Sequence, residues 1–147
     1  MIVDTLNRQI LKCLQQNARL SNAEIGRQVG ISSPAVSERI KKMEDLGIIE
    51  GYKTIVSPFE IGYQLKAIIT LRAFMGKLRP FLEKVKTYDE VINCYRITGD
   101  ENIVMEVVLK NQKHLETFID QLITYGESKT QIVLSRVVKQ KEVIPIK

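Results

Sequence analysis

Between Ser33 and Lys42 the chain carries small polar and charged side chains of the kinds that contact DNA. A glutamate such as Glu38 accepts a hydrogen bond from cytosine N4, and a serine such as Ser37 pairs with several base edges. Lysine and arginine side chains bind phosphates, which orient a protein on the duplex without reading its sequence. The candidate DNA-contacting residues are Ser33, Pro34, Ser37, Glu38, Arg39, Lys41, Lys42 and, on the preceding segment, Arg27.

Two short predicted helices would position these side chains. Ser21, with Glu24 three residues later, forms a capping box, which predicts a helix that ends at Gly30. Ser32 is a typical N-cap, and Pro34 fits the first turn of a second helix. Two helices joined by a short turn that contains glycine form a helix-turn-helix, whose second helix enters the major groove.

The second of these helices has an inner and an outer face. Val36, Ile40 and Met43 recur at helical spacing and form the stripe that packs inward, which leaves the polar side chains outside. A similar apolar pattern from residue 3 to residue 14 predicts another helix ahead of the pair. The first 47 residues are therefore expected to form a small helical domain.

The charged run on the second helix also fits roles that involve no DNA. Helix-turn-helix shapes occur in proteins that never touch DNA, and the charges could belong to an ordinary solvated face. Glu38 could pair with Lys42 one helical turn later. Arg39 could instead pack its stem against the first helix.

Length and composition limit the classes of protein. The chain has 147 residues and a formal net charge of +5, a mild excess that permits nucleic-acid binding without showing it. No apolar run approaches the roughly 20 residues of a membrane span, and the first residues do not resemble a signal peptide. Cys13 and Cys94 lie far apart in apolar patterns, so we expect reduced core cysteines in a cytoplasmic protein and no zinc site.

After Gly47 the hydrophobic period changes from that of a helix to that of a strand. The expected elements are an extended linker or strand over 48–57, strands over 65–75, 91–98, 103–109 and 130–144, and helices near 78–85 and over 111–125. The order of the second half is β-α-β-β-α-β, the ferredoxin-like arrangement. The predicted fold class is therefore α+β.

The predicted sheet has two apolar faces. Leu65, Ala67, Ile69, Leu71, Ala73 and Met75 would lie on the face that the two helices cover. The opposite face would carry Ile68, Thr70, Phe74, Val104, Val108, Val133 and Val137. An exposed patch of this size is unusual in a monomer, so we expect a second subunit to cover it. The alternative is a one-residue slip in one strand, which would invert its faces.

The segment RLSNAEIGRQVGISSPAVSERIKKMEDLGIIEGYKTIVSP resembles the DNA-binding half of the Lrp/AsnC regulators. The matching positions are Asn17, Arg19, Ser21, Glu24, Ile25, Gly30, Ser32, Val36, Arg39, Ile40, Glu44, Gly47, Ile49, Gly51 and Tyr52. The resemblance continues through the second half, which the family calls its RAM domain. It implies a helix-turn-helix domain over 1–50, a linker over 51–64 and a RAM domain over 65–147.

The resemblance also implies a function. Family members are transcriptional regulators that bind double-stranded DNA, dimerise through their sheet faces and often assemble into octamers. They bind small effectors, usually amino acids, between dimers. We therefore expect a cytoplasmic, sequence-specific DNA-binding regulator that is a homo-oligomer, has no cofactor and responds to an amino acid or a related small effector.

The family's effector loop typically reads Gly-Asp-Tyr-Asp, and the corresponding residues here are Gly99, Asp100, Glu101 and Asn102. The glycine and the first acid match, whereas the tyrosine and the second acid do not. The segment SKTQIVL resembles the family's last strand, which would add the hydroxyls of Ser128 and Thr130 to the effector site. The loop could instead be an ordinary hairpin turn.

We expect no enzymatic activity. The only histidine, His114, lies on a predicted helix and is expected to be exposed, and no phosphate loop, nucleophile elbow or metal cluster is present in the sequence. Two other classes stay open, because ferredoxin-like dimers also occur in small monooxygenases and in metabolite-binding modules. A DNA-binding measurement would separate a regulator from a metabolite-binding subunit without DNA affinity.

Overall fold

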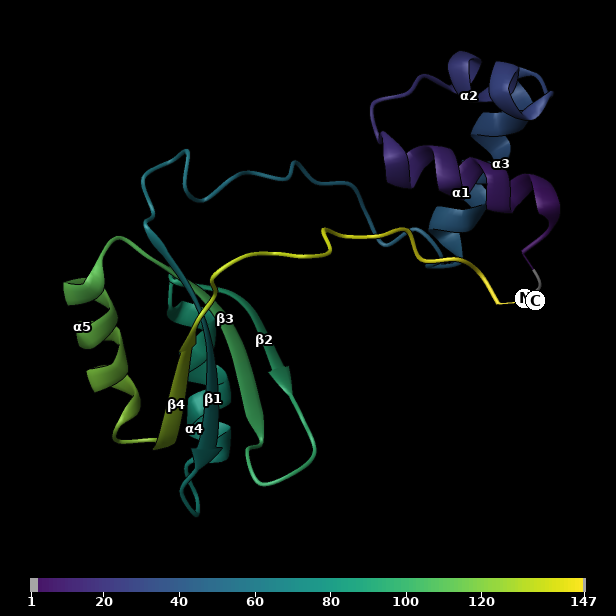
Figure 1. Ribbon diagram of the computed structural model, residues 1–147. Coiled ribbons are helices and arrows are strands. Elements are labelled where there is room, and N and C mark those ends of the chain that lie inside the picture. Colours follow the sequence, from purple (N-terminus) through teal and green to yellow (C-terminus); the bar gives the residue numbers. More distant parts are fainter. Residues whose placement is uncertain (1–2, 147) are drawn as a thin grey trace. The chain divides into compact units, whose positions relative to one another are not determined.

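The computed structural model describes residues 3–146 and divides the chain into two compact units (Figure 1). One unit holds the described residues through Ile55 together with those from Val138 onward, and the other holds Val56–Val137. The sequence prediction assigned the residues after 137 to the second domain, whereas the structure groups them with the first. The reason is a set of hydrogen bonds from this segment to the first helix.

The first unit contains the three predicted helices. They are α1 (Thr5–Gln16), α2 (Asn22–Val29) and α3 (Ser33–Asp45). Each begins at a side-chain cap, which is Asp4, Ser21 and Ser32 in turn. The apolar stripes meet in a core that contains Ile10, Ile25, Val36 and Met43, all fully buried. The helix predictions are confirmed here, because caps and stripes are local features of the sequence.

An extended segment follows α3. Residues 48–57 form no helix or strand, in agreement with the extended-linker alternative. The Tyr52 hydroxyl donates a hydrogen bond to Glu44 Oε1 at 2.9 Å, which fixes the start of the segment against α3. Burial, together with the neighbouring Glu44 carboxylate, raises the pKa of Tyr52 to about 12.

The second unit is a four-stranded antiparallel sheet with helices on one face (Figure 1). Its elements are β1 (Leu65–Ala73), α4 (Leu78–Lys84), the short 3₁₀ helix η1 (Val85–Thr87), β2 (Val91–Arg96), β3 (Ile103–Leu109), α5 (Gln112–Leu122) and β4 (Gly126–Ile132). The strand order is β2-β3-β1-β4. The predicted α+β fold and the β-α-β-β-α-β order are confirmed.

The core of this unit lies between the sheet and the helices. Ala67, Ile69 and Leu71 of β1 are fully buried, as are the alternate residues of β3. Phe81 of α4 and Phe118 of α5 cover them. The period of two along each strand places these side chains on a single face.

The last strand differs from its prediction. It spans Gly126–Ile132 rather than 130–144, because β4 pairs only with β1, from Gly126 opposite Ala73 to Ile132 opposite Ala67. A Cβ at Gly126 would lie 2.3 Å from the Arg72 carbonyl oxygen, so this close approach requires glycine. At the opposite edge of the sheet, the register between β2 and β3 shifts between Val91 and Asn93, as in a β-bulge.

The outer face of the sheet is less apolar than predicted. Ile68 and Val104 lie on it as expected, and Val108 is only 3% exposed. Val133 and Val137 lie beyond the end of β4, and Phe74 lies beyond the end of β1. Polar side chains lie among the apolar ones. Glu106, directly opposite Ile68, contacts Lys66 and Asn93. Two further pairs are Arg72 with Glu127 and Glu101 with Lys129.

Candidate nucleic-acid interface and effector loop

The corner between α2 and α3 is built by local contacts. Gly30, with a φ of 77°, ends α2 in the left-handed conformation, and its N–H donates to the Gly26 carbonyl at 2.8 Å. The N–H of Ile31 donates to the same oxygen at 3.0 Å. The turn between α2 and α3 is therefore completed within the three residues 30–32.

Gly26 is a residue that the sequence analysis missed. A Cβ at this position would lie 2.5 Å from the Ile31 carbonyl oxygen, so any side chain would push the turn away from α2. Its position inside a good helical pattern is the signal that could have revealed it, because glycine costs stability there unless the packing requires it.

The predicted capping box is present at the start of α2. Glu24 Oε2 accepts from the Ser21 backbone N–H at 2.7 Å, and the Glu24 N–H donates to Ser21 Oγ at 3.2 Å. The hydrogen bond from the Ser21 N–H, followed by that from its hydroxyl, lowers the pKa of Glu24. The carboxylate therefore stays charged beside the positive end of the α2 dipole.

The outer face of α3 carries most of the predicted DNA contacts. Pro34, Ser37, Glu38, Lys41 and Lys42 are exposed, whereas Ser33 is half-buried. Arg27 is exposed on α2. Within residues 3–146 Glu38 and Lys42 form no ion pair with each other, so both side chains remain available on the surface.

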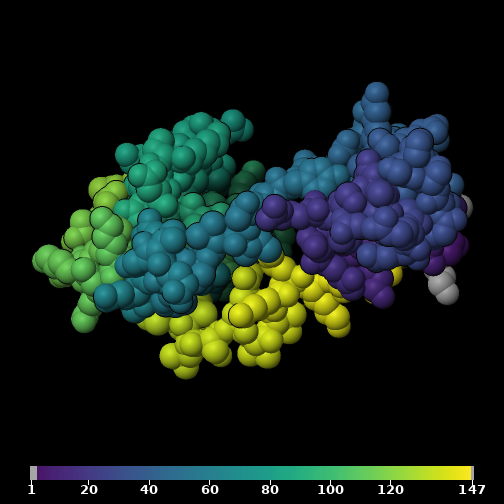
Figure 2. Space-filling view, turned by 90° about the horizontal axis from the view of Figure 1, so that it is seen from above, coloured from purple at the N-terminus to yellow at the C-terminus, as the bar shows by residue number. Residues whose placement is uncertain are grey.

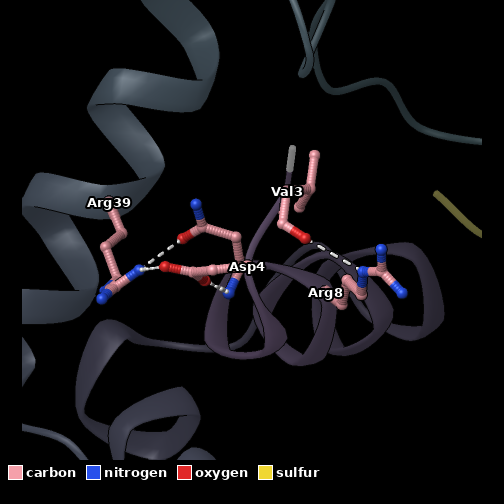
Figure 3. Close-up of polar contacts among 5 residues, drawn as sticks. Val3, Asp4, Arg8 and Arg39 are labelled. Carbon is pink, nitrogen blue, oxygen red and sulfur yellow. Dashed lines mark hydrogen bonds and ion pairs between the residues drawn. The ribbon is translucent and has the colours of Figure 1, made fainter. Parts of the chain in front are cut away.

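Arg39 lies differently from the other predicted contacts. Its Nη1 donates to Asp4 Oδ2 at 2.7 Å and to Asn7 Oδ1 at 2.9 Å, so the guanidinium joins α3 to the start of α1 (Figure 3). Asp4 also caps α1 by accepting from the Asn7 N–H at 2.7 Å. This backbone bond first, and the Arg39 guanidinium second, lower the pKa of Asp4. The geometry favours the alternative in which Arg39 holds the first helix.

The predicted effector loop ends in a network that involves the backbone of β1. Asn102 donates its N–H to the Leu71 carbonyl at 3.1 Å, and its side-chain oxygen accepts from the Ala73 N–H at 3.0 Å. Gly99, with a φ of 114°, adopts a conformation that favours glycine. Gly99 and Asp100 are exposed at the tip of the loop. The side chain of Asn102 is therefore occupied in holding the loop to the sheet.

The remaining predicted effector residues lie on both faces of the sheet. Glu101 Oε1 lies 2.6 Å from Lys129 Nζ, and this hydrogen bond and charge lower the pKa of Glu101 and raise that of Lys129. Lys129 faces outward with its partner Thr70. Ser128 and Thr130, one residue to either side, therefore face the helices. The hydroxyls of Ser128 and Thr130 thus lie near the end of the sheet that carries the loop. They lie on the helix-covered face, whereas Glu101 contacts Lys129 on the outer face.

His114 is half-buried rather than exposed. Its Nε2 lies 2.8 Å from Glu90 Oε1, and its Nδ1 accepts from the Lys110 N–H at 3.1 Å. Both ring nitrogens thus have structural partners. In the part of the chain that the structure describes, no cluster of His, Cys, Asp or Glu could hold a metal ion, and no helix is long and apolar enough to cross a membrane.

Comparison with protein families also gives two parts, although the second match extends to residue 143, beyond the unit boundary at Val137. A family model described as winged helix-turn-helix DNA-binding matches residues 3–50. A second family model, described as Lrp/AsnC ligand binding domain, matches residues 66–143. The HTH-type transcriptional regulator Ptr1 of Methanocaldococcus jannaschii is 33% identical over 99% of this chain and 100% of its own length. The regulator LrpB of Bacillus subtilis is 31% identical over 95% of this chain and 93% of its own.

Solved structures show the same relationship. AsnC of E. coli superimposes with a TM-score of 0.84 at 30% identity, covering 95% of this chain and 97% of its own. A transcriptional regulator of Neisseria meningitidis, solved as a complex with L-Met, superimposes with a TM-score of 0.91 at 25% identity. The match covers 97% of this chain and 96% of that regulator's chain. The predicted family resemblance is confirmed, and the chain belongs to the Lrp/AsnC family of transcriptional regulators.

Proposed function

We propose that this regulator binds two DNA half-sites as a homodimer in the cytoplasm and is modulated by an amino acid. The observation that carries the proposal is the capped α2–α3 corner, which presents Ser37, Glu38 and Lys41 on the outer face of a helix of thirteen residues. Recognition helices of this kind insert into the major groove.

The predicted DNA-contacting residues fall into two groups, one for base edges and one for phosphates. Ser33, Pro34, Ser37 and Glu38 lie in the N-terminal half of α3, the part that contacts base edges in helix-turn-helix proteins. Lys41 and Lys42 follow in the C-terminal half, and Arg27 lies on α2, so these three bind phosphates. Arg39 acts from behind the interface by holding α3 to α1.

The outer face of the sheet supports dimerisation. Ile68, Val104 and the 55% exposed Tyr95 form its apolar centre, which a second copy would remove from water. The polar pairs on the same face, such as Glu106 with Lys66, would supply the hydrogen bonds that specific interfaces carry beside their apolar contacts. A symmetric dimer would hold two recognition helices for half-sites about 34 Å apart, and octamers would form from four such dimers.

The loop at residues 99–102 supports effector binding. Asp100 is exposed at its tip and offers a charge for an ammonium group. The positive φ of Gly99 allows a backbone turn whose N–H groups would bind a carboxylate. Ser128 and Thr130 would contribute only if the ligand also reaches the helix side of β4. The Neisseria relative's complex with L-Met makes methionine the first candidate to test.

The DNA part of the proposal is tested by selecting duplexes from a random pool and measuring their affinity by fluorescence anisotropy. Affinity should fall steeply with salt, because each phosphate contact releases counterions. Replacing Ser37 or Glu38 by alanine should change base preference at a cost of about 1–3 kcal/mol, whereas Lys42→Ala should weaken all sequences alike. Lys113→Ala, the same change in the second unit, is the control and should leave DNA affinity unchanged.

Three results would contradict the DNA part. Affinity that does not depend on salt would remove the electrostatic part of the argument. Equal losses on every sequence from Ser37→Ala, Glu38→Ala and Lys42→Ala would remove the division between base and phosphate contacts. A monomer at the concentrations that bind DNA, seen by sedimentation, would remove the dimer.

The effector part is tested by calorimetry with each of the twenty amino acids at millimolar concentration. A ligand that shifts DNA affinity must bind one state of the protein better than another, with a coupling of about 1–3 kcal/mol. Asp100→Ala should abolish binding, while Asp120→Ala, an exposed acid on α5, should not. Binding that survives Asp100→Ala would place the effector elsewhere.

A further inference from the structure

A short segment after the sheet is attached to the first helix of the DNA-binding unit. Gln15 Nε2 donates to the Val143 carbonyl at 3.1 Å, and the Val143 N–H donates to Gln15 Oε1 at 2.8 Å. The side-chain amide of Gln15 thus pairs with the backbone as a neighbouring strand would. We call residues 143–146 the strap. In Figures 1 and 2 the yellow end of the chain lies beside the purple α1.

The strap reaches the part of α1 that holds the recognition helix. Arg8 Nη2 donates to the Ile146 carbonyl at 3.2 Å, while its Nε donates to the Val3 carbonyl at 3.0 Å. Figure 3 shows that Asp4, the next residue, carries the hydrogen bond to Arg39. Ile146 is therefore bound through Arg8 and α3 through Asp4, one helical turn apart on α1.

The backbone, rather than the side chains, holds the strap. Val143 is 78% exposed and Ile146 is 94% exposed, although Val143 and Pro145 line a groove together with Leu11 and Ile49. A segment held by a few solvent-exposed hydrogen bonds opens with a small free energy. The strap is thus suited to detach and rebind while both units stay folded.

The contact between the strap and α1 adds a second connection between the two units. The chain passes from one unit to the other twice, at Ile55–Val56 and at Val137–Val138. The second passage lies five residues beyond Ile132, the last residue of β4, and five residues before the strap. With the strap docked, the DNA-binding unit is tied to the sheet unit by two segments instead of one.

We propose that the docked strap limits the freedom of the DNA-binding unit and thereby raises affinity for duplexes with two half-sites. This inference rests on the proposed dimer. When one recognition helix has bound, a smaller range of motion that still spans the two half-sites raises the effective concentration of the second helix at its half-site. Affinity for a single half-site does not depend on this tether, because it needs only one recognition helix.

The test compares the full chain with two variants and one control. Gln15→Leu removes both hydrogen bonds to Val143, and truncation after Glu142 removes the strap. Gln9→Leu makes the same chemical change at another exposed position of α1 and is the control. Anisotropy is measured on a selected duplex with two half-sites and on the same duplex with one half-site scrambled. Hydrogen exchange reports the protection of the Val143 amide.

Gln15→Leu and the truncation should each weaken binding to the two-site duplex several-fold and leave the one-site affinity unchanged. Gln15→Leu should also abolish protection of the Val143 amide, and Gln9→Leu should change nothing. An unprotected Val143 amide in the unaltered chain, equal losses on both duplexes, or no loss on either would overturn the inference. Failure of the proposed dimer is distinguishable, because the unaltered chain would then bind both duplexes equally.

Discussion

The two units are stabilised by cores of different kinds. Among the described residues, the core of the DNA-binding unit contains six buried side chains, none of them aromatic. The core of the sheet unit contains twelve, and Phe81, Tyr88 and Phe118 are among them. Because aromatic side chains bury the largest areas, the sheet unit gains more from apolar burial. The DNA-binding unit depends correspondingly more on its helix caps and on single polar contacts such as Asp4 with Arg39.

The largest expected effect tests the aromatic core. Phe118 is fully buried and packs edge to face on Tyr88, with ring centroids 5.3 Å apart. Phe118→Ala should lower the free energy of unfolding of the sheet unit by about 3–5 kcal/mol, because the cavity cannot close fully. Urea unfolding followed by hydrogen exchange measures each unit separately. Ile119→Ala, at a half-buried position of the same helix, should cost clearly less.

An equal loss from Phe118→Ala in both units would show that they unfold together. The two cores would then not stabilise the two units independently of each other.

The next effect uses one glycine in each unit. A Cβ would lie 2.5 Å from a carbonyl oxygen at Gly26 and 2.3 Å from one at Gly126. Gly26→Ala should destabilise the DNA-binding unit and Gly126→Ala the sheet unit, each by about 1–3 kcal/mol through overpacking. The same urea experiment gives both values. A larger fractional loss of stability is expected for the DNA-binding unit, and the opposite order would contradict the argument.

A smaller effect should appear at acid pH in the DNA-binding unit. The pKa of Asp4 is lowered by the Asn7 N–H and by Arg39, so its charged form is favoured in the folded state. The stabilisation is present above the unfolded pKa of 3.8 and is lost as pH falls through the lower folded value. Asp4→Asn keeps a cap acceptor and should flatten the pH dependence of unfolding below about pH 4.

Asp4→Ala also removes the cap and should cost about 1 kcal/mol at neutral pH. Unfolding curves of the three proteins at a series of pH values check both statements. A slope below pH 4 that persists in Asp4→Asn would assign it to another group.

The smallest effect concerns a polar atom in the core of the sheet unit. The Tyr88 hydroxyl is buried and finds no hydrogen-bond partner among the described residues, and its burial raises the pKa of Tyr88. Tyr88→Phe removes this group and keeps the ring against Phe118. We expect the stability of the sheet unit to stay unchanged or to rise by up to about 1 kcal/mol. A loss above that size in thermal unfolding would reveal a partner for the hydroxyl.

The sequence predicted features that depend on neighbouring residues. The structure confirms three such local features, namely the capping box at Ser21 and Glu24, the end of α2 at Gly30 and the cap at Ser32. The bounds of β4 depend on pairing with a strand more than fifty residues away. The ladder ends at Ile132, and one further bond, from the Val133 N–H to the Lys66 carbonyl at 2.9 Å, follows it. The faces of Ser128 and Thr130 depend on the same register. The bond between Arg39 and Asp4 joins residues 35 apart, which no periodic pattern reveals.

The two edges of the sheet bear on how the folded chain behaves at high concentration. Addition of a foreign strand needs an edge with regular, unbroken backbone pairing. At one edge β2 is only six residues long and its register with β3 is interrupted near Val91. At the other, β4 alternates the charged side chains of Glu127 and Lys129 on its outer face. Both edges are therefore poor templates for fibril growth, and the chain should stay free of edge-to-edge aggregation while its outer face remains open to a partner.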